Sequence, residues 1–259
     1  MRIRITRSGQ AGFSLIELMM SVLLLIIVMA AVFRQINEIQ KHTHSESMKL
    51  DLTQESREFV DQFARDIHMS GYPISSLYSV QNATATMQQT RAVAVGLVYA
   101  SNTHLIFEGD ANGDGIVYRV EYTYVDSDPN DNCPCVRRAM TQKGADGTDI
   151  LSGYGPPTYY TEVQNVLSPA TTGLPIFTYF EANGSLLDVN SNTCNAALPS
   201  TLNPPPTPAT GCADLIHDNN IVQNIDAIKV TLNTRSTLLD PTTGLNAVNT
   251  VASIAELEN

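Results

Sequence analysis

The chain has 259 residues, of which 43% are hydrophobic, so one sizeable core can be buried. Its 15 lysines and arginines stand against 26 aspartates and glutamates, which gives a net charge of −11. An acidic chain of this kind argues against nucleic acid as a partner, because a phosphate backbone is bound through clustered Lys and Arg.

The N-terminus combines a short basic leader with a long apolar run. Residues 1–12 contain three arginines and no acid, and after Glu17 the chain is apolar up to Phe33 with only Ser21 interrupting it. A helix from Phe13 to Phe33 would be roughly 31 Å long, enough to cross the hydrocarbon core of a bilayer. A carboxylate inside a membrane helix costs about 2.5–3.5 kcal/mol, so Glu17 is expected to have a partner and a function.

The segment from Gly12 to Leu18 (GFSLIEL), followed by this apolar run, resembles the N-terminal signal of type IV prepilins and type II secretion pseudopilins. The resemblance implies that a prepilin peptidase cuts between Gly12 and Phe13 and methylates the new amino group of Phe13. It also implies that Glu17 meets the N-terminal amine of a neighbouring subunit in a fibre. An amine and a carboxylate in apolar surroundings neutralise each other, and removal of either leaves the other unpaired.

Two other interpretations of this N-terminus are an ordinary signal anchor with a stray glutamate and a cleaved secretory signal. The second usually has a shorter apolar core, of roughly 7–15 residues, that ends in a small-residue cleavage site. Here the candidate cleavage site, between Gly12 and Phe13, precedes the apolar run. This order favours the prepilin interpretation.

The leader also predicts the topology of the chain. Its three arginines place the N-terminus in the cytoplasm by the positive-inside rule, and the rest of the chain outside the inner membrane. The resemblance implies a single-pass protein of the bacterial inner membrane that later joins a periplasmic or cell-surface fibre. Its implied partners are other pilins or pseudopilins, the prepilin peptidase and an inner-membrane assembly platform.

The helix is predicted to continue well past the apolar run. Residues 34–69 contain neither Gly nor Pro, and Phe59, Val60, Phe63 and Ile67 give this part an apolar face at helical spacing. The sequence Ser-Gly-Tyr-Pro at 70–73 predicts its end. The predicted parts are a leader (1–12), a transmembrane or fibre-core helix (13–34), the amphipathic half of the same helix (35–72) and an extracytoplasmic β-rich domain (73–259).

From residue 91 the pattern changes to β-branched and aromatic residues in short runs, which is typical of strands. Asn183-Gly184 between two such runs predicts a hairpin with a type I′ turn. Stretches rich in Thr, Pro and Gly at 144–161 and 199–210 predict loops. The predicted strands are 91–100, 104–108, 116–125, 136–140, 174–182, 185–189, 221–234 and 248–254.

These elements predict an α+β, pilin-like fold, with a long N-terminal helix packed on an antiparallel sheet that carries long loops. The segment 59–72 (FVDQFARDIHMSGY) resembles the end of this helix in PilW-type minor pilins and J-type pseudopilins. Members of the family often carry a helix-breaking Gly or Pro in the membrane half. Residues 13–34 have neither, which fits a minor or tip subunit better than a main building block.

The loop from Asp110 to Gly115, with Glu121 farther on, has the spacing of a calcium loop. Strands rather than helices are expected to flank it, so a solvated turn of a β-hairpin is the alternative interpretation. If the loop binds Ca²⁺, the ion orders the loop; no cofactor is otherwise required. The candidate ligands are the side chains of Asp110, Asn112, Asp114 and Glu121 and the backbone carbonyl of Ile116.

The four cysteines are an even number in a compartment that permits disulfides. Cys194 and Cys212 bracket a Pro-rich stretch, and a bond between them would contribute about 3 kcal/mol in the chain-entropy model. This pairing leaves Cys133 with Cys135, which flank Pro134. Cross-pairing between the two sets is the alternative, and the Cys-x-Cys spacing is not that of a usual zinc site.

No catalytic constellation is visible, because the five histidines fall in no His-Glu-x-x-His or similar motif and no Gly-Lys-Ser/Thr phosphate loop is present. We therefore expect a structural protein rather than an enzyme. The sequence predicts a type IV pilus minor pilin, with a type II secretion pseudopilin as the closest alternative. A membrane-anchored, calcium-binding adhesion domain that never polymerises is a third interpretation.

Overall fold

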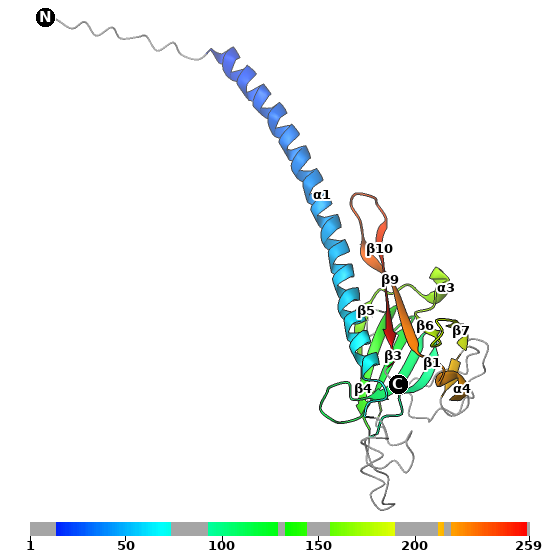
Figure 1. Ribbon diagram of the computed structural model, residues 1–259. Helices are drawn as coiled ribbons and strands as arrows, with labels where there is room; N and C mark the ends of the chain where they lie inside the picture. The colour runs from blue at the N-terminus through cyan, green and yellow to red at the C-terminus, as the bar shows by residue number, and fades with distance from the viewer. Residues whose placement is uncertain are drawn as a thin grey trace, which may run out of the picture.

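The computed structural model describes residues 14–73, 93–128, 133–143, 156–189, 212–214 and 219–257. They form an α+β, pilin-like arrangement in which a long N-terminal helix leads into a head of two antiparallel sheets (Figure 1). The first half of the helix projects away from the head, and the second half packs against it. The predicted fold class is confirmed.

Helix α1 (Leu15–His68) is continuous over 54 residues. Its end follows the predicted stop signal: Met69 closes the last turn, and Gly71 has a φ of +80°, a left-handed conformation that favours glycine. Gly71 then donates its backbone N–H to the carbonyl of Glu108 at 2.8 Å, which fastens the chain leaving the helix to the sheet. The helix thus ends within two residues of the predicted end at Ser70.

The larger sheet has six strands in the order β5-β4-β3-β2-β1-β8. Its central strands β2 and β3 are buried along most of their length. The strands are β1 (Leu97–Ser101), β2 (His104–Gly109), β3 (Tyr118–Val125), β4 (Cys135–Gln142), β5 (Tyr159–Gln164) and β8 (Cys212–Asp214).

The smaller sheet has four strands in the order β10-β9-β6-β7, and its longest strands, β9 and β10, form a hairpin that lies along α1 (Figure 1). Two one-turn helices, α3 (Pro169–Thr172) and α4 (Asn219–Val222), lie in the connections. The strands of this sheet are β6 (Phe177–Phe180), β7 (Leu186–Leu187), β9 (Ala227–Leu239) and β10 (Asn246–Glu256).

The core lies where α1 meets both sheets. Phe63 is fully buried, and its ring centroid lies 5.4 Å from that of Tyr122 on β3 and 5.9 Å from that of Phe177 on β6. Phe59, one turn earlier, contacts the edge of Tyr122 with a centroid distance of 5.6 Å. The apolar face predicted for the second half of the helix is therefore the face that joins the two sheets.

A buried ion pair supports the junction between the helix end and β2. The Lys143 ammonium lies 2.6 Å from the Glu108 carboxylate, and both side chains are almost fully buried. The same carboxylate accepts the backbone N–H of Val95 at 3.1 Å, while Lys143 also donates to the carbonyl of Val93 at 3.2 Å. These extra hydrogen bonds offset the cost of removing two charges from water.

The structure corrects three details of the sequence prediction. The Asn183-Gly184 turn is not type I′, because only Gly184 has a positive φ (+79°) and its N–H bonds to the Glu181 carbonyl. This is a type I turn followed by a left-handed glycine, the usual three-residue hairpin loop. Strand β5 begins inside a segment predicted as a loop, and α4 occupies the start of a segment predicted as a strand.

Candidate assembly interface

The first half of α1 is an apolar surface that no other part of the described chain covers. Every residue from Ser14 to His44 is exposed, and the first residue of the helix that is buried is Ser45. The most apolar part of α1 has a mean hydropathy of 2.8 and is long enough to cross a membrane. The leucine, isoleucine, valine, methionine and phenylalanine side chains between residues 15 and 33 are 43–78% exposed.

Glu17 lies in the first turn of this apolar half, with its side chain exposed. Its backbone N–H donates to the Ser14 carbonyl at 3.0 Å, and its carbonyl accepts the Ser21 hydroxyl at 2.9 Å. A carboxylate in the first turn interacts favourably with the positive end of the helix dipole. Gly12 and Phe13, the predicted cleavage and methylation residues, lie outside the described residues.

A motif comparison bears directly on this end of the chain. Residues 7–33 match the model of the prokaryotic N-terminal methylation motif. The chain carries a prepilin-type N-terminus. The motif supports a type IV pilin-like protein in general, and with the apolar helix it fits anchoring in the inner membrane before assembly. No curated protein and no solved structure matches the chain.

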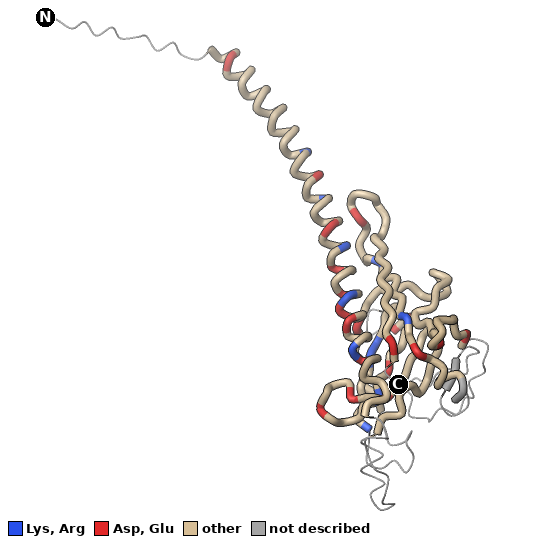
Figure 2. Tube along the Cα trace, viewed as in Figure 1, with Lys and Arg blue, Asp and Glu red and all other residues tan. Residues whose placement is uncertain are grey.

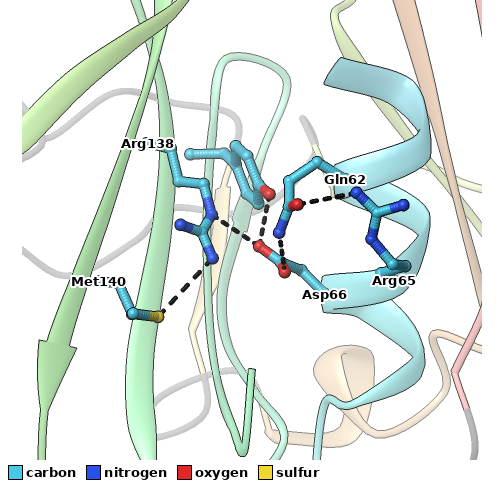
Figure 3. Close-up of polar contacts among 6 residues, drawn as sticks. Gln62, Arg65, Asp66, Arg138 and Met140 are labelled. Atoms are coloured by element: carbon cyan, nitrogen blue, oxygen red, sulfur yellow. Dashed lines mark hydrogen bonds and ion pairs between the residues drawn. The ribbon is translucent and has the colours of Figure 1, made fainter. Parts of the chain in front are cut away.

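The second half of the pilin-like helix is tied to the head by a buried carboxylate that sequence reasoning missed. Asp66 is 1% exposed, and its carboxylate accepts the Tyr122 hydroxyl at 2.6 Å and the Arg138 Nε–H at 2.7 Å (Figure 3). Gln62, one turn earlier on α1, donates to the same carboxylate at 2.7 Å. Both partners on the sheet lie far along the chain, so only the fold brings this cluster together.

The cluster shifts the ionisation of its members in a consistent way. Burial raises the pKa of the Tyr122 hydroxyl well above its usual value, and the neighbouring Asp66 charge raises it further. For Arg138, burial lowers the pKa, but the charges and hydrogen bonds of Asp66 and Tyr122 together outweigh burial, and the pKa is raised. Tyr122 is therefore a neutral donor and Arg138 a cationic donor around neutral pH.

The candidate calcium residues are not all brought together. In the β2–β3 connection, the Asp110 carboxylate accepts the backbone N–H groups of Asp114 and Gly115 at 3.0 and 2.9 Å. Asp114 in turn accepts the N–H of Ile116, the residue whose carbonyl was a candidate ligand. Asn112 lies in the turn between them. These contacts are those of a turn that satisfies its own backbone donors.

Glu121 lies apart from this turn, on β3, and is held by other groups. Its carboxylate accepts the Tyr159 hydroxyl at 2.7 Å and lies 3.0 Å from Arg119 Nε and 3.8 Å from His104 Nε2. Burial raises its pKa, but His104, Arg119 and Tyr159 together bring that pKa below its usual value. Among the described residues, no group of three or more His, Cys, Asp or Glu is placed to hold a metal ion.

Calcium binding by this loop stays a prediction, and the contacts favour the self-contained turn. We expect the thermal unfolding midpoint of the chain to be the same in calcium and in EDTA. Asp110→Ala is expected to destabilise the head by about 1.5–3 kcal/mol in both solutions, because two backbone donors lose a charged acceptor. A midpoint raised by calcium in the unmodified chain, but not in Asp110→Ala, would support a calcium site instead.

The cysteines are only partly described. The sulfur atoms of Cys133 and Cys135 are joined in a disulfide at the start of β4. Cys212 begins β8, while Cys194 lies outside the described residues, so a bond between these two stays a prediction.

Proposed function

We propose that this chain is a minor pilin of a type IV pilus. It is cut between Gly12 and Phe13, methylated at Phe13 and incorporated into a pilus-like fibre at the priming or tip position. The observation that carries the proposal is that the first half of α1 is apolar and exposed, while the head packs only against the second half of the helix. The methylation motif at residues 7–33 is typical of structural subunits rather than of enzymes, and supports an assembly role.

An apolar helix surface of this size must be removed from water. Monomeric soluble proteins rarely expose contiguous apolar patches beyond a few hundred square ångströms, and larger ones indicate a membrane or a protein partner. Before assembly the bilayer covers the helix, and in the fibre the helices of neighbouring subunits cover it. The same surface thus serves both as an anchor and as an assembly interface.

Glu17 is proposed to set the docking of one subunit on the next. In the apolar fibre core its carboxylate would pair with the Phe13 amine of a neighbour, which would otherwise be a buried, unpaired charge. The first turn of α1 presents Glu17 without an intramolecular ion pair among the described residues. The carboxylate is therefore available to a neighbour.

The closest alternative is a pseudopilin of a type II secretion system, which would use the same cleavage, helix and docking on a shorter fibre. The unbroken helix of 54 residues fits either assignment. A membrane-anchored adhesion domain that never polymerises differs from both, because it gives Glu17 no role. The experiment below separates the assembly proposal from this third interpretation.

The test is the intact mass and N-terminal sequence of the chain purified from native membranes and from sheared surface fibres. We expect a chain that begins at N-methylated Phe13 and is present in both fractions. Glu17→Ala should be processed normally but should fall more than about tenfold in the fibre fraction. The substitution leaves the neighbour's Phe13 amine unpaired in apolar surroundings; such a charge costs up to about 2.5–3.5 kcal/mol, and 1.4 kcal/mol corresponds to a factor of ten.

Glu38→Ala is the matched control, because Glu38 is an exposed glutamate of the same helix beyond the apolar run and its neighbour is His42. It should leave fibre incorporation unchanged. A chain that still begins at Met1, or one absent from fibres, contradicts the proposal. Presence in a secretion-dependent pseudopilus but not in surface pili would favour the pseudopilin.

A further inference from the structure

The end of the β9–β10 hairpin extends beyond the sheet to which it belongs. Strand β6 pairs with β9 only from Ala227 to Val230, and Arg235 makes a further backbone bond to the Asn165 carbonyl at 3.0 Å. Past this point, residues 236–248 form a hairpin tip that rises beside α1 (Figure 1). The tip is thus a projection of the head toward the exposed half of the helix.

The hairpin tip is held against α1 at a defined level. The Ser236 hydroxyl lies 3.6 Å from the Met48 sulfur. The Asp240 carboxylate accepts the Thr242 N–H at 2.8 Å, and the pKa of Asp240 is lowered by that bond and further by the Ser45 side chain of α1. The turn is closed by Asp240 and Leu245, whose backbone N–H and carbonyl are 2.8 Å apart. The tip therefore has a fixed position relative to the helix.

The surface that the tip presents is free of exposed charge and carries several exposed apolar side chains. Residues 236–255 contain one ionisable side chain, Asp240, which is 3% exposed, although charged residues make up 16% of the chain. Figure 2 shows the tip almost entirely without Lys, Arg, Asp or Glu. Four apolar side chains of the tip are more than half exposed: Leu238 (58%), Leu239 (61%), Leu245 (69%) and Val248 (58%).

A lipid bilayer that holds the apolar helix does not reach this cluster. Ser45, at the level of Asp240, lies about twelve residues beyond Phe33, or roughly 18 Å along the helix axis. The polar headgroup layer outside the hydrocarbon core is only about 5–8 Å thick on each side. The leucines beside Asp240 therefore lie in water while the chain waits in the membrane, and a protein rather than lipid would have to cover them.

The cluster lies near the head end of the apolar surface of α1, from which the polar residues 40–44 separate it. Ile36 and Ile39, 42% and 63% exposed, extend that surface from Phe33 toward the level of the hairpin tip. A partner helix that packs along the first half of α1 and is displaced toward the head would reach the tip. An uncharged, apolar stretch of that partner fits the tip itself, because the tip offers it no exposed charge.

We propose that the hairpin tip docks the apolar N-terminal helix of a neighbouring pilin-type subunit in the assembled fibre. The inference rests on the proposed function, since it requires incorporation into a fibre. The tip is a second contact for the neighbour's helix, outside the helix bundle itself. Its chemistry selects an uncharged stretch of leucine, isoleucine and valine, such as residues 18–33 of this chain.

A photo-cross-linking experiment tests this docking directly. A benzophenone amino acid is placed at Leu245 in the full-length chain, expressed in the native host, and fibres are irradiated before they are sheared. Cross-linked peptides are then identified by mass spectrometry. We expect an intermolecular product that joins residue 245 to the apolar N-terminal helix of another subunit. The same probe at Leu186, an equally exposed leucine (65%) on β7, should not give it.

A pair of variants supplies an independent readout. Leu239→Asp with Leu245→Asp should lower the ratio of fibre to membrane protein at least about tenfold, equivalent to roughly 1.4 kcal/mol, while processing at Phe13 continues. Leu186→Asp should leave the ratio unchanged. Equal thermal unfolding midpoints of the two variants would show that the head remains folded.

The outcomes separate this inference from the proposed function. If the unmodified chain is absent from fibres, the proposed function fails, and the docking inference fails with it. If the chain is present in fibres and residue 245 cross-links only to lipid, to a globular segment or to nothing, the docking inference alone is overturned. An unchanged fibre ratio for the double aspartate variant would overturn it as well.

Discussion

Asp66→Ala is expected to lower the free energy of unfolding of the head by about 3–5 kcal/mol. The substitution removes a buried carboxylate that accepts hydrogen bonds from Tyr122, Arg138 and Gln62. The Arg138 side chain is only 16% exposed, so its guanidinium would be left as a largely buried, unpaired charge. Breaking one side of such a pair costs far more than the intact pair contributes, because the remaining charge is desolvated without compensation.

The measurement is urea unfolding of the full-length chain in detergent, followed by tyrosine fluorescence because the chain has no tryptophan. Asp61→Ala, at an exposed aspartate of the same helix, is the control and should change stability by less than about 0.5 kcal/mol. Adding Arg138→Met to Asp66→Ala should restore part of the loss, since no unpaired charge then remains. A loss below 1 kcal/mol in Asp66→Ala would contradict the role given to this cluster.

Phe63→Ala is expected to cost a similar amount, about 3–5 kcal/mol, through loss of packing. Phe63 is fully buried, and it contacts Tyr122 of the larger sheet and Phe177 of the smaller sheet. Its removal leaves a cavity where α1 packs on both sheets. Since close-packed interiors relax only partly around a cavity, both the transfer energy and the packing contacts are lost.

Phe33→Ala is the matched control, because Phe33 belongs to the same helix but is 57% exposed and touches no part of the head. It should leave the unfolding transition of the head unchanged in the same detergent. Phe63→Leu, which keeps most of the volume, should cost less than Phe63→Ala. Equal stability of Phe63→Ala and the unmodified chain would mean that the helix is not part of the cooperative core.

The long helix could be predicted from the sequence because each signal is local. The absence of Gly and Pro up to residue 69, the spacing of Phe59 and Phe63, and the Ser-Gly-Tyr-Pro stop all act within a few residues. Most central strands were predicted for the same reason, because a short apolar run marks β2 and an alternation of β-branched and aromatic residues marks β3. These elements would be recognisable in any fold that used them.

The contacts that tie the helix to the head could not be predicted in the same way. Asp66 does carry a local signal, since it lies three residues after Phe63 and therefore on the apolar face of the helix. Its partners, however, are 56 and 72 residues away along the chain, and no spacing rule connects them. Strand β5 was missed because its residues, Tyr159–Gln164, are half exposed and form a strand only through pairing with β4.

The alignment of the β9–β10 hairpin with α1 determines how the head responds to a pulling force. Successive contacts join Thr234 to Ser56 and Ser236 to Met48, so the strand and the helix run side by side along one axis. A tension applied to the exposed end of α1 would therefore load these contacts in shear, together with the Asp66–Arg138 pair farther down. Contacts loaded in shear break together rather than one after another, and resistance to forced unfolding is governed by the rate of that single event. The head is thereby expected to remain attached to α1 when the exposed end of the helix is pulled.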